Sequence, residues 1–195
     1  MVYHKTKKIG IDLDDVVLDF NNTLMPYHNK KFGTNYQRDD ITSFELMELW
    51  KCTRKEVLRR IDEFYQSEEH RHAEPVLGVR SALNLLASKY ELHIVTSKPE
   101  LLRLMTEEWL DCNIGQVIHK VHFTNQHTDL FRKTKGEFCS DFGIEYFIED
   151  SLEYAVNVAS WGIPVCLYDV PWNQGIVKYP IKRVFSWMEI LDILV

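Results

Sequence analysis

The sequence predicts an α/β fold built on a doubly wound parallel sheet, and three observations lead to that prediction. Short apolar runs alternate with longer segments whose apolar residues recur at helical spacing, which is the pattern of parallel strands joined by helices. Polar side chains follow three of the runs at the point where each run ends. The chain has 195 residues, enough for one core domain with a modest insertion.

The first apolar run is Ile9–Ile11, which follows two lysines and predicts a short buried strand. Residues 17–32 then carry apolar side chains at helical spacing, and Gly33 follows them as a helix stop. We therefore expect a helix that leaves the sheet directly after the first strand.

The next segment predicts more helices and no strand. One of these helices begins at Thr53, which forms a predicted capping box with Glu56. We interpret residues 17–75 as a small helical cap inserted after the first strand, and residues 1–16 and 76–195 as the core domain. An insertion of this kind is a candidate lid over an active site.

The rest of the chain alternates between the two patterns. The predicted strands lie at residues 91–97, 120–123, 146–151, 164–168 and 182–185. The predicted helices lie at residues 79–89, 100–110 and 135–142, from the fourth strand through 159, and from 186 to the end.

Composition excludes some classes of function. The formal net charge is −6, which argues against a partner made of duplex nucleic acid or an anionic membrane. The first residues lack the apolar centre of a signal peptide, and no run of 18 apolar residues occurs. We expect a soluble cytoplasmic protein, either a monomer or a homodimer.

The cysteines and histidines form no recognisable metal motif. The four cysteines are far apart in sequence, which predicts reduced thiols in a reducing compartment. His70 with His72, and His119 with His122, have spacings that a metal could use, but no partner ligands occur at matching positions. We interpret these histidines as surface or packing residues.

The acidic residues after the first run are the leading candidates for chemistry. Asp12, Asp14 and Asp15 fall at the carboxyl end of a buried strand, where open α/β sheets bind their ligands, and strand alternation would direct Asp12 and Asp14 the same way. Carboxylates held so close require a hard divalent cation or a shared proton. One could then act as a nucleophile and the other could transfer protons. The alternative is a solvated acidic loop or a helix cap.

Two other predicted strands also end in polar side chains. Thr96 and Ser97 offer hydroxyl groups for a phosphate, and Glu149 and Asp150 offer carboxylates for a magnesium ion. Lys135, on the helix before the fourth strand, could place a positive charge on a phosphoryl group. Each has an ordinary alternative as a helix cap or a surface lysine. Together, at one edge of a parallel sheet, they predict a single site.

These residues follow the order of the four motifs of the haloacid dehalogenase-like (HAD) phosphotransferases. The stretch Asp12–Val16 resembles the D-x-D-x-V motif of that family, and the hydroxyl, lysine and acid pair resemble the other three. The resemblance covers nearly the whole chain and implies a HAD-like Rossmannoid core. Asp15 stands where many relatives carry glycine, and only backbone contacts are expected there.

The resemblance also implies a role for each residue. Asp12 would be the nucleophile and Asp14 the general acid/base. The phosphate ligands would be Thr96, Ser97 and Lys135. The ligands of Mg²⁺ would be Asp12, the backbone carbonyl of Asp14, Asp150 and, as a supporting ligand, Glu149.

A narrower resemblance is to the 5′(3′)-deoxyribonucleotidases. It rests on Asp19–Phe20, on Phe32–Thr34 followed by Asp40–Phe44, on the position of the cap, and on Pro171–Asn173. It implies a nucleoside monophosphate as substrate. Aromatic side chains of the cap that could stack on a nucleobase are Phe20, Phe44, Trp50 and Tyr65.

We therefore expect a magnesium-dependent phosphomonoester hydrolase that forms an aspartyl phosphate and acts on nucleotides. One alternative keeps the chemistry and changes the substrate to a sugar phosphate or another small phosphomonoester. The other is a non-catalytic protein that binds phosphate.

Overall fold

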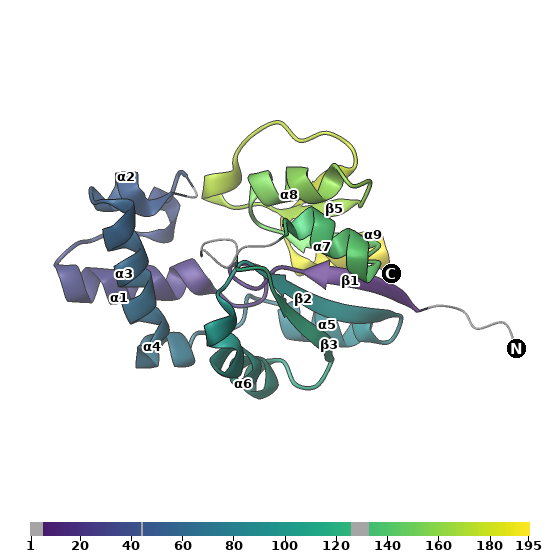
Figure 1. Ribbon diagram of the computed structural model, residues 1–195, viewed down its shortest axis with the longest axis horizontal. Coiled ribbons are helices and arrows are strands. Elements are labelled where there is room, and N and C mark those ends of the chain that lie inside the picture. The colour runs from purple at the N-terminus through teal and green to yellow at the C-terminus, as the bar shows by residue number, and fades with distance from the viewer. Residues whose placement is uncertain (1–5, 44, 126–132) are drawn as a thin grey trace, which may run out of the picture.

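The structure of the protein is a computed structural model that describes residues 6–43, 45–125 and 133–195. Within these ranges the sheet has six strands in the order β3-β2-β1-β4-β5-β6, and every pairing is parallel (Figure 1). The strands are β1 Lys7–Ile11, β2 Tyr90–Thr96, β3 Ile118–Phe123, β4 Tyr146–Glu149, β5 Val165–Tyr168 and β6 Ile181–Val184. The strand order reverses between β1 and β4, so the predicted doubly wound sheet is confirmed.

Helices cover both faces of the sheet. Their bounds are α1 Phe20–Phe32, α2 Leu46–Trp50, α3 Arg54–Tyr65, α4 Glu68–Arg71, α5 Val79–Ala87, α6 Arg103–Asn113, α7 Lys135–Phe142, α8 Leu152–Ala159 and α9 Trp187–Leu194. Side chains of α5, α6 and α9 share one hydrophobic cluster with one face of the sheet, and those of α7 and α8 share another with the opposite face. In the described ranges, no helix combines the length and the apolar character needed to span a membrane.

Helices α1 to α4, which we name the cap helices, lie beyond the carboxyl ends of the strands (Figure 1, purple to blue). Two neighbouring segments connect them to the sheet: Val76 N donates to Val17 O (2.8 Å) and Asp19 N donates to Glu74 O (2.9 Å). Because Val17 belongs to this connection, α1 begins at Phe20 and not at Val17.

Local sequence explains several helix ends. Gly33 and Gly143 end α1 and α7 in the left-handed conformation, as expected of helix-stop glycines. The Thr53 hydroxyl accepts from Glu56 N, but the Glu56 carboxylate pairs with Arg59 and Arg60 and does not return to the Thr53 backbone. The predicted capping box is therefore half formed, because charge-assisted bonds to guanidinium groups are stronger than a bond to a neutral N–H.

One glycine permits close packing beneath the site. A Cβ added at Gly10 in β1 would lie 2.5 Å from the Phe147 ring of β4. No side chain fits at that distance, so glycine at position 10 allows Phe147 to cross β1 beside the topological switch point. Cys139 is buried in the same hydrophobic cluster as Phe147, Cys166 is buried in the cluster on the opposite face of the sheet, and all four cysteines are free thiols.

Candidate active site

Lys135 joins the carboxyl ends of β1 and β4. It is the first residue of α7, is fully buried, and donates from Nζ to Asp12 Oδ1 (2.7 Å) and to Glu149 Oε2 (2.8 Å). Burial acts to lower the pKa of Lys135, but the two carboxylates raise it above its ordinary value. The lysine is therefore a fixed positive charge, and not the surface lysine of the alternative interpretation.

Three buried carboxylates gather beside this lysine. One oxygen each from Asp12, Glu149 and Asp150 lies within 4.8 Å of the others. Burial raises the pKa of Asp150, and the neighbouring Glu149 and Asp12 raise it further. If all three were ionised, they would exceed the charge of Lys135 by two, and a hard divalent cation bound by oxygen ligands at this spacing would offset that excess.

Glu149 and Asp150 differ in how they are bound. Glu149 Oε1 accepts from the backbone N–H groups of Asp150 and Ser151 (both 3.1 Å), while Oε2 is bound to Lys135, so both oxygens have protein partners. Asp150 Oδ2 accepts from the indole of Trp172 (2.8 Å). Glu149 is thus bound more completely than Asp150, which suits a supporting residue.

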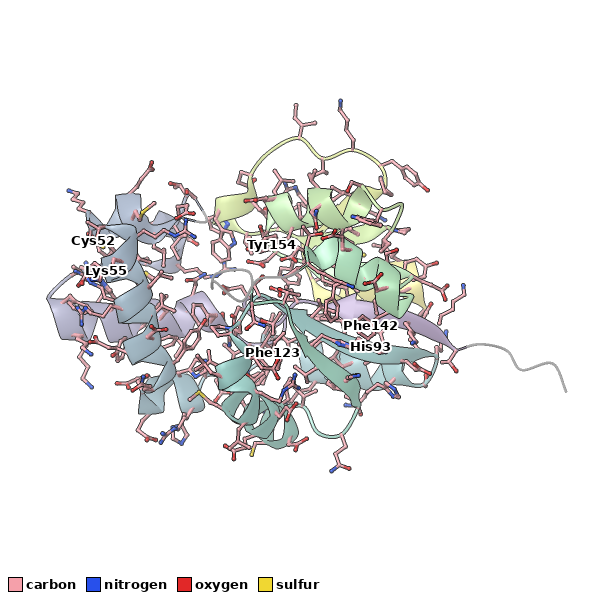
Figure 2. The ribbon with its side chains drawn as sticks, viewed as in Figure 1. Cys52, Lys55, His93, Phe123, Phe142 and Tyr154 are labelled. Carbon is pink, nitrogen blue, oxygen red and sulfur yellow. The ribbon has the colours of Figure 1, made fainter. Side chains whose placement is uncertain are left out.

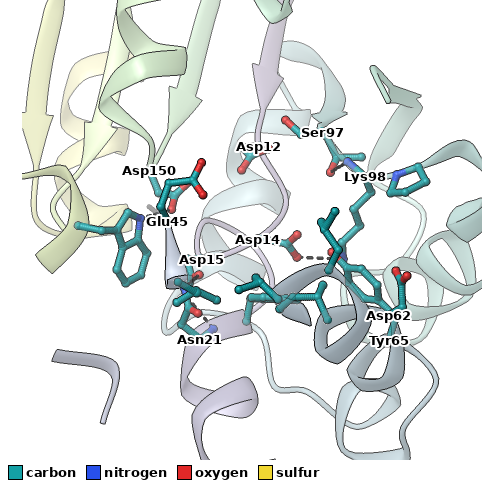
Figure 3. A pocket seen from close by; sticks show the side chains of 18 of the residues that line it. Asp12, Asp14, Asp15, Asn21, Glu45, Asp62, Tyr65, Ser97, Lys98 and Asp150 are labelled. Carbon is teal, nitrogen blue, oxygen red and sulfur yellow. Dashed lines mark hydrogen bonds and ion pairs between the residues drawn. The ribbon is translucent and has the colours of Figure 1, made fainter. Parts of the chain in front are cut away.

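Asp14 lies in a turn after β1 and not in the strand, because β1 ends at Ile11. Strand alternation therefore does not place it, although Asp12 and Asp14 line the same pocket (Figure 3). Asp14 Oδ1 lies 2.9 Å from Nζ of Lys98, which is 4% exposed. Burial raises the pKa of Asp14, and the ammonium group of Lys98 opposes that shift.

Asp15 makes more than the backbone contacts expected from the resemblance. Its φ of 58° lies in the left-handed region that glycine favours, and aspartate is among the few other residues that tolerate it. Its buried carboxylate accepts from the backbone N (3.1 Å) and side-chain Nδ2 (2.6 Å) of Asn21 (Figure 3). Burial raises the pKa of Asp15 to about 8, and the bond from Asn21 opposes that rise. Asp15 therefore anchors the first turn of α1.

The two hydroxyl residues lie where β2 ends. Thr96 is buried at the end of the strand, and its hydroxyl accepts from Lys98 N (3.2 Å). Thr96 and Ser97 both line the pocket. The Thr96 hydroxyl therefore stabilises the turn after β2 and also lies at the site, so the capping and ligand-binding interpretations are compatible.

The pocket has a volume of about 370 Å³ and two chemically different ends. Carboxylates that follow β1 and β4, together with Lys98, form one end (Figure 3). Apolar and aromatic side chains from the cap and its adjoining segments form much of the other, namely Phe20, Ile41, Leu46, Val57, Leu58, Ile61 and Tyr65. The pocket thus combines an acidic region with an apolar surface.

The four aromatic candidates of the cap divide between the pocket and the core. Phe20 and Tyr65 line the pocket, and the Lys98 ammonium lies over both rings. Trp50 is absent from the pocket lining; it is 5% exposed and stacks on His28 with ring centroids 4.2 Å apart, so it serves packing. Phe44 lies outside the described residues.

Lys98 and Trp172 are two site residues whose contacts the sequence patterns did not indicate. Lys98 follows Thr96 and Ser97 directly, and that proximity was the one available signal. Trp172 belongs to the stretch Pro171–Asn173, but its bond to Asp150 depends on a 3-10 helix 22 residues further along the chain. In that same helix Asn173 Nδ2 donates to Asp150 O (2.6 Å), so this short helix holds Asp150 from two sides.

Comparison with known structures agrees with this geometry. A haloacid dehalogenase-like hydrolase, SP0104 of Streptococcus pneumoniae, superposes with a TM-score of 0.67 at 12% identity, covering 96% of this chain and 98% of that one. The HAD hydrolase YfnB of Bacillus subtilis, solved with magnesium, superposes with a TM-score of 0.65 at 16% identity, covering 97% of this chain and 99% of that one. These similarities show that the fold is that of the HAD hydrolases.

Sequence comparison narrows the family. YqfW of Bacillus subtilis (strain 168), named as a candidate nucleotidase, is 30% identical over 188 residues, which cover 93% of this chain and 90% of the relative. A nucleotidase of Clostridium acetobutylicum is 23% identical over 189 residues, covering 95% and 92%. The model of the family described as 5′ nucleotidase, deoxy (pyrimidine), cytosolic type C matches residues 6–195. The chain therefore belongs to this nucleotidase family and is a phosphatase of the HAD superfamily.

Proposed function

We propose that the protein is a magnesium-dependent phosphomonoester hydrolase that dephosphorylates nucleoside monophosphates, deoxynucleotides foremost, through an aspartyl phosphate. The observation that carries this proposal is the two-ended pocket. Its acidic end suits a metal-bound phosphate, and its apolar end, with Phe20 and Tyr65, suits a nucleobase.

In the proposed first step, a carboxylate oxygen of Asp12 attacks phosphorus in line. The new bond joins Asp12 to phosphorus, the ester P–O bond breaks, and Asp14 donates a proton to the departing oxygen. Burial supports this role, since it raises the pKa of Asp14 and favours the protonated form that the step requires.

In the second step, Asp14 is a carboxylate and accepts a proton from water. The oxygen of that water attacks phosphorus, and the bond between phosphorus and the Asp12 oxygen breaks. Inorganic phosphate leaves, and the Asp12 carboxylate is restored. Thr96, Ser97 and Lys135 would bind the phosphoryl oxygens. Lys135 also holds the Asp12 carboxylate in place for both steps.

Asp12, Asp150 and the backbone carbonyl of Asp14 would hold Mg²⁺, with Glu149 supporting the set through Lys135. The ion would balance the excess negative charge of the site and polarise the phosphoryl group. Residues 17–75 are proposed as the cap, because the cap helices supply the apolar end of the pocket and the catalytic residues come from the sheet. The family description supports a cytosolic location.

The test is release of inorganic phosphate by the purified protein. We expect hydrolysis of 4-nitrophenyl phosphate that requires Mg²⁺, and a higher kcat/KM for deoxynucleoside monophosphates than for sugar phosphates. Asp12→Asn should remove this activity, because the amide cannot act as the nucleophile, and the exposed-site control Asp192→Asn should retain it.

Three results would contradict parts of the proposal. Asp12→Asn activity within tenfold of wild type would exclude the mechanism. A higher kcat/KM for sugar phosphates than for nucleoside monophosphates would show that sugar phosphates are the substrate class. Phosphate binding without turnover in Mg²⁺ would indicate a binding protein.

A further inference from the structure

A group of three side chains lies outside the active site and has the composition of a transition-metal site. Glu91 and His93 lie on β2, and His119 lies on β3. One ligand atom from each lies within 4.8 Å of the other two. His93 comes three residues before Thr96, so the group lies about 10 Å back along β2 from the end of the strand that forms the active site.

A β-bulge brings the third residue into the group. Leu92 pairs with Ile118 and His93 pairs with Lys120, so β3 passes His119 without pairing it. Bulges redirect side chains. The His119 ring lies 5.2 Å from the His93 ring, centroid to centroid, so residues of two neighbouring strands share one face of the sheet.

His93 presents an unused nitrogen to this group. Its side chain is 3% exposed, and its Nε2 makes no hydrogen bond to a described residue. Glu91 Oε2 is 3.7 Å from that nitrogen and 4.0 Å from His119 Nε2. A buried ring nitrogen that makes no hydrogen bond is costly, and coordination of a metal ion would satisfy it.

Nδ1, the other ring nitrogen of His93, has a hydrogen-bond partner, as the second ring nitrogen of a metal-ligating histidine commonly does. His93 Nδ1 lies 2.9 Å from His122 Nε2, and the two rings are stacked at 7°. One of these nitrogens must carry the proton. If it is His93 Nδ1, then His93 Nε2 has a lone pair free for a metal, and His122 fixes both the tautomer and the ring orientation. Figure 2 labels His93 beside Phe142, on the part of the sheet far from the cap helices.

We propose that Glu91, His93 and His119 bind Zn²⁺ and so link the edge strand β3 to β2. Two imidazoles and a carboxylate are a common ligand set for zinc, with a fourth position open to water. Tetrahedral ligand atoms lie about 3.3 Å apart, so the side chains of Glu91 and His119, which are 33% and 58% exposed, would close by roughly 1 Å. Lys8, whose Nζ is 3.8 Å from Glu91 Oε2, would lose that contact in part.

The test is titration of the full chain with ZnCl₂ in a calorimeter, in excess Mg²⁺ so that the acidic cluster of the active site is already filled. We expect one Zn²⁺ per chain and a rise in Tm. His119→Gln should weaken binding by at least about tenfold and remove the rise in Tm, and His122→Gln should weaken binding by about 10–100-fold through loss of the orienting bond.

His72→Gln is the matched control, because His72 is an exposed histidine that directly follows α4 and lies outside the group, and the variant should bind Zn²⁺ as wild type does. His119 is exposed, so its substitution tests the ligand without disturbing the core. Phosphate release by His119→Gln in Mg²⁺ should equal that of wild type, which separates this proposal from the proposed function. Zn²⁺ binding that His119→Gln leaves unchanged, or no binding by wild type in excess Mg²⁺, would overturn the proposal.

Discussion

Lys135 is the residue on which the charge balance of the site depends. Its ammonium group is bound to both Asp12 and Glu149, so it holds one carboxylate of each strand end at a fixed position. A buried lysine between two carboxylates stays charged, and its charge would offset one of the three that the ionised cluster would carry. The charge that remains suits the divalent cation that we propose for the site, and the bonds of Lys135 hold the Asp12 carboxylate in place.

The different surroundings of Glu149 and Asp150 lead to a prediction about metal affinity. Glu149→Ala should raise the Mg²⁺ concentration needed for half-maximal activity by about 10–100-fold, as expected for a residue that supports the ligands. Asp150→Ala should raise it further, because it removes a direct ligand. Titration of activity with Mg²⁺ measures both values. Glu153→Ala, an exposed acidic residue of α8, is the control, and the opposite ranking would exchange the two roles.

At the scale of elements, α1 and α3 carry the apolar end of the pocket. The Phe20 ring packs edge-on against Phe64 of α3 with centroids 5.3 Å apart, and against Tyr65 at 5.9 Å. Phe20 also follows directly from the connection that joins the cap helices to the sheet. The same ring therefore holds two cap helices together and faces the pocket.

Replacing Phe20 separates these two roles. Phe20→Ala should lower kcat/KM for nucleoside monophosphates by about 5-fold to 150-fold, the equivalent of about 1–3 kcal/mol of base stacking, and leave hydrolysis of a small phosphate nearly unchanged. Steady-state kinetics on both substrates measures the ratio. Tyr27→Ala is the matched control, because Tyr27 packs on Phe64 at 5.3 Å from the same helix but lies outside the pocket lining. Equal losses on both substrates would assign Phe20 to packing alone.

Two buried histidines make the cap helices sensitive to acid. Burial lowers the pKa of His28 to about 4, and the charge of Arg60 contributes a smaller part of that shift. Burial also lowers the pKa of His70 to about 3, with a smaller contribution from Lys98. The unfolded chain binds these protons near pH 6.5 and the folded chain does not. Stability should therefore fall as the pH drops from about 6.5 towards 4, by up to about 1.4 kcal/mol per pH unit for each histidine.

Urea unfolding at pH 7 and pH 5 measures this loss. His70→Phe should reduce the difference between the two pH values, since phenylalanine suits a site formed by Phe20, Phe64 and Tyr65 and takes up no proton. The exposed-residue variant His72→Gln should show the same difference as wild type. An unchanged pH dependence in His70→Phe would show that other groups cause the acid sensitivity.

For the whole molecule, the candidate active site lies where the strand order of the sheet reverses, between β1 and β4. The ends of β1 and β4 are neighbours at the switch point, so Asp12 and Asp150 meet although 138 positions separate them along the sequence. Repulsion among the buried carboxylates opposes folding, and a bound cation would relieve it. The active site and the stability of the fold should therefore be linked.

That link predicts stabilisation by magnesium. At a Mg²⁺ concentration about 100 times its Kd, the free energy of unfolding should rise by about 2.7 kcal/mol, and thermal unfolding should show a higher Tm. Asp150→Ala should lose most of the shift, while Asp192→Asn should keep it. A Tm independent of Mg²⁺ in wild type would contradict binding of the ion at the acidic cluster.

The sequence by itself was sufficient for the sheet, its helices and the order of the site residues. Short apolar runs are typical of strands that are buried on both faces, and carboxylates or hydroxyls follow three of these runs. The local pattern therefore predicts both the strand and the polar residues at its end. The predicted strand near residues 120–123 and the predicted helix at 135–142 are both present in the structure. The family resemblance rested on the same residues.

Tertiary structure alone decided which of these residues meet and what else joins them. The bond from Trp172 to Asp150, the ion pair of Lys98 with Asp14, and the stacking of Trp50 on His28 all depend on chain packing that leaves no periodic signal in the sequence. Periodicity shows which face of an element is apolar, but it does not show which distant side chain lies against that face. The raised pKa values of Asp14 and Asp150 likewise result from burial and from neighbouring charges, because both depend on contacts between segments far apart along the chain.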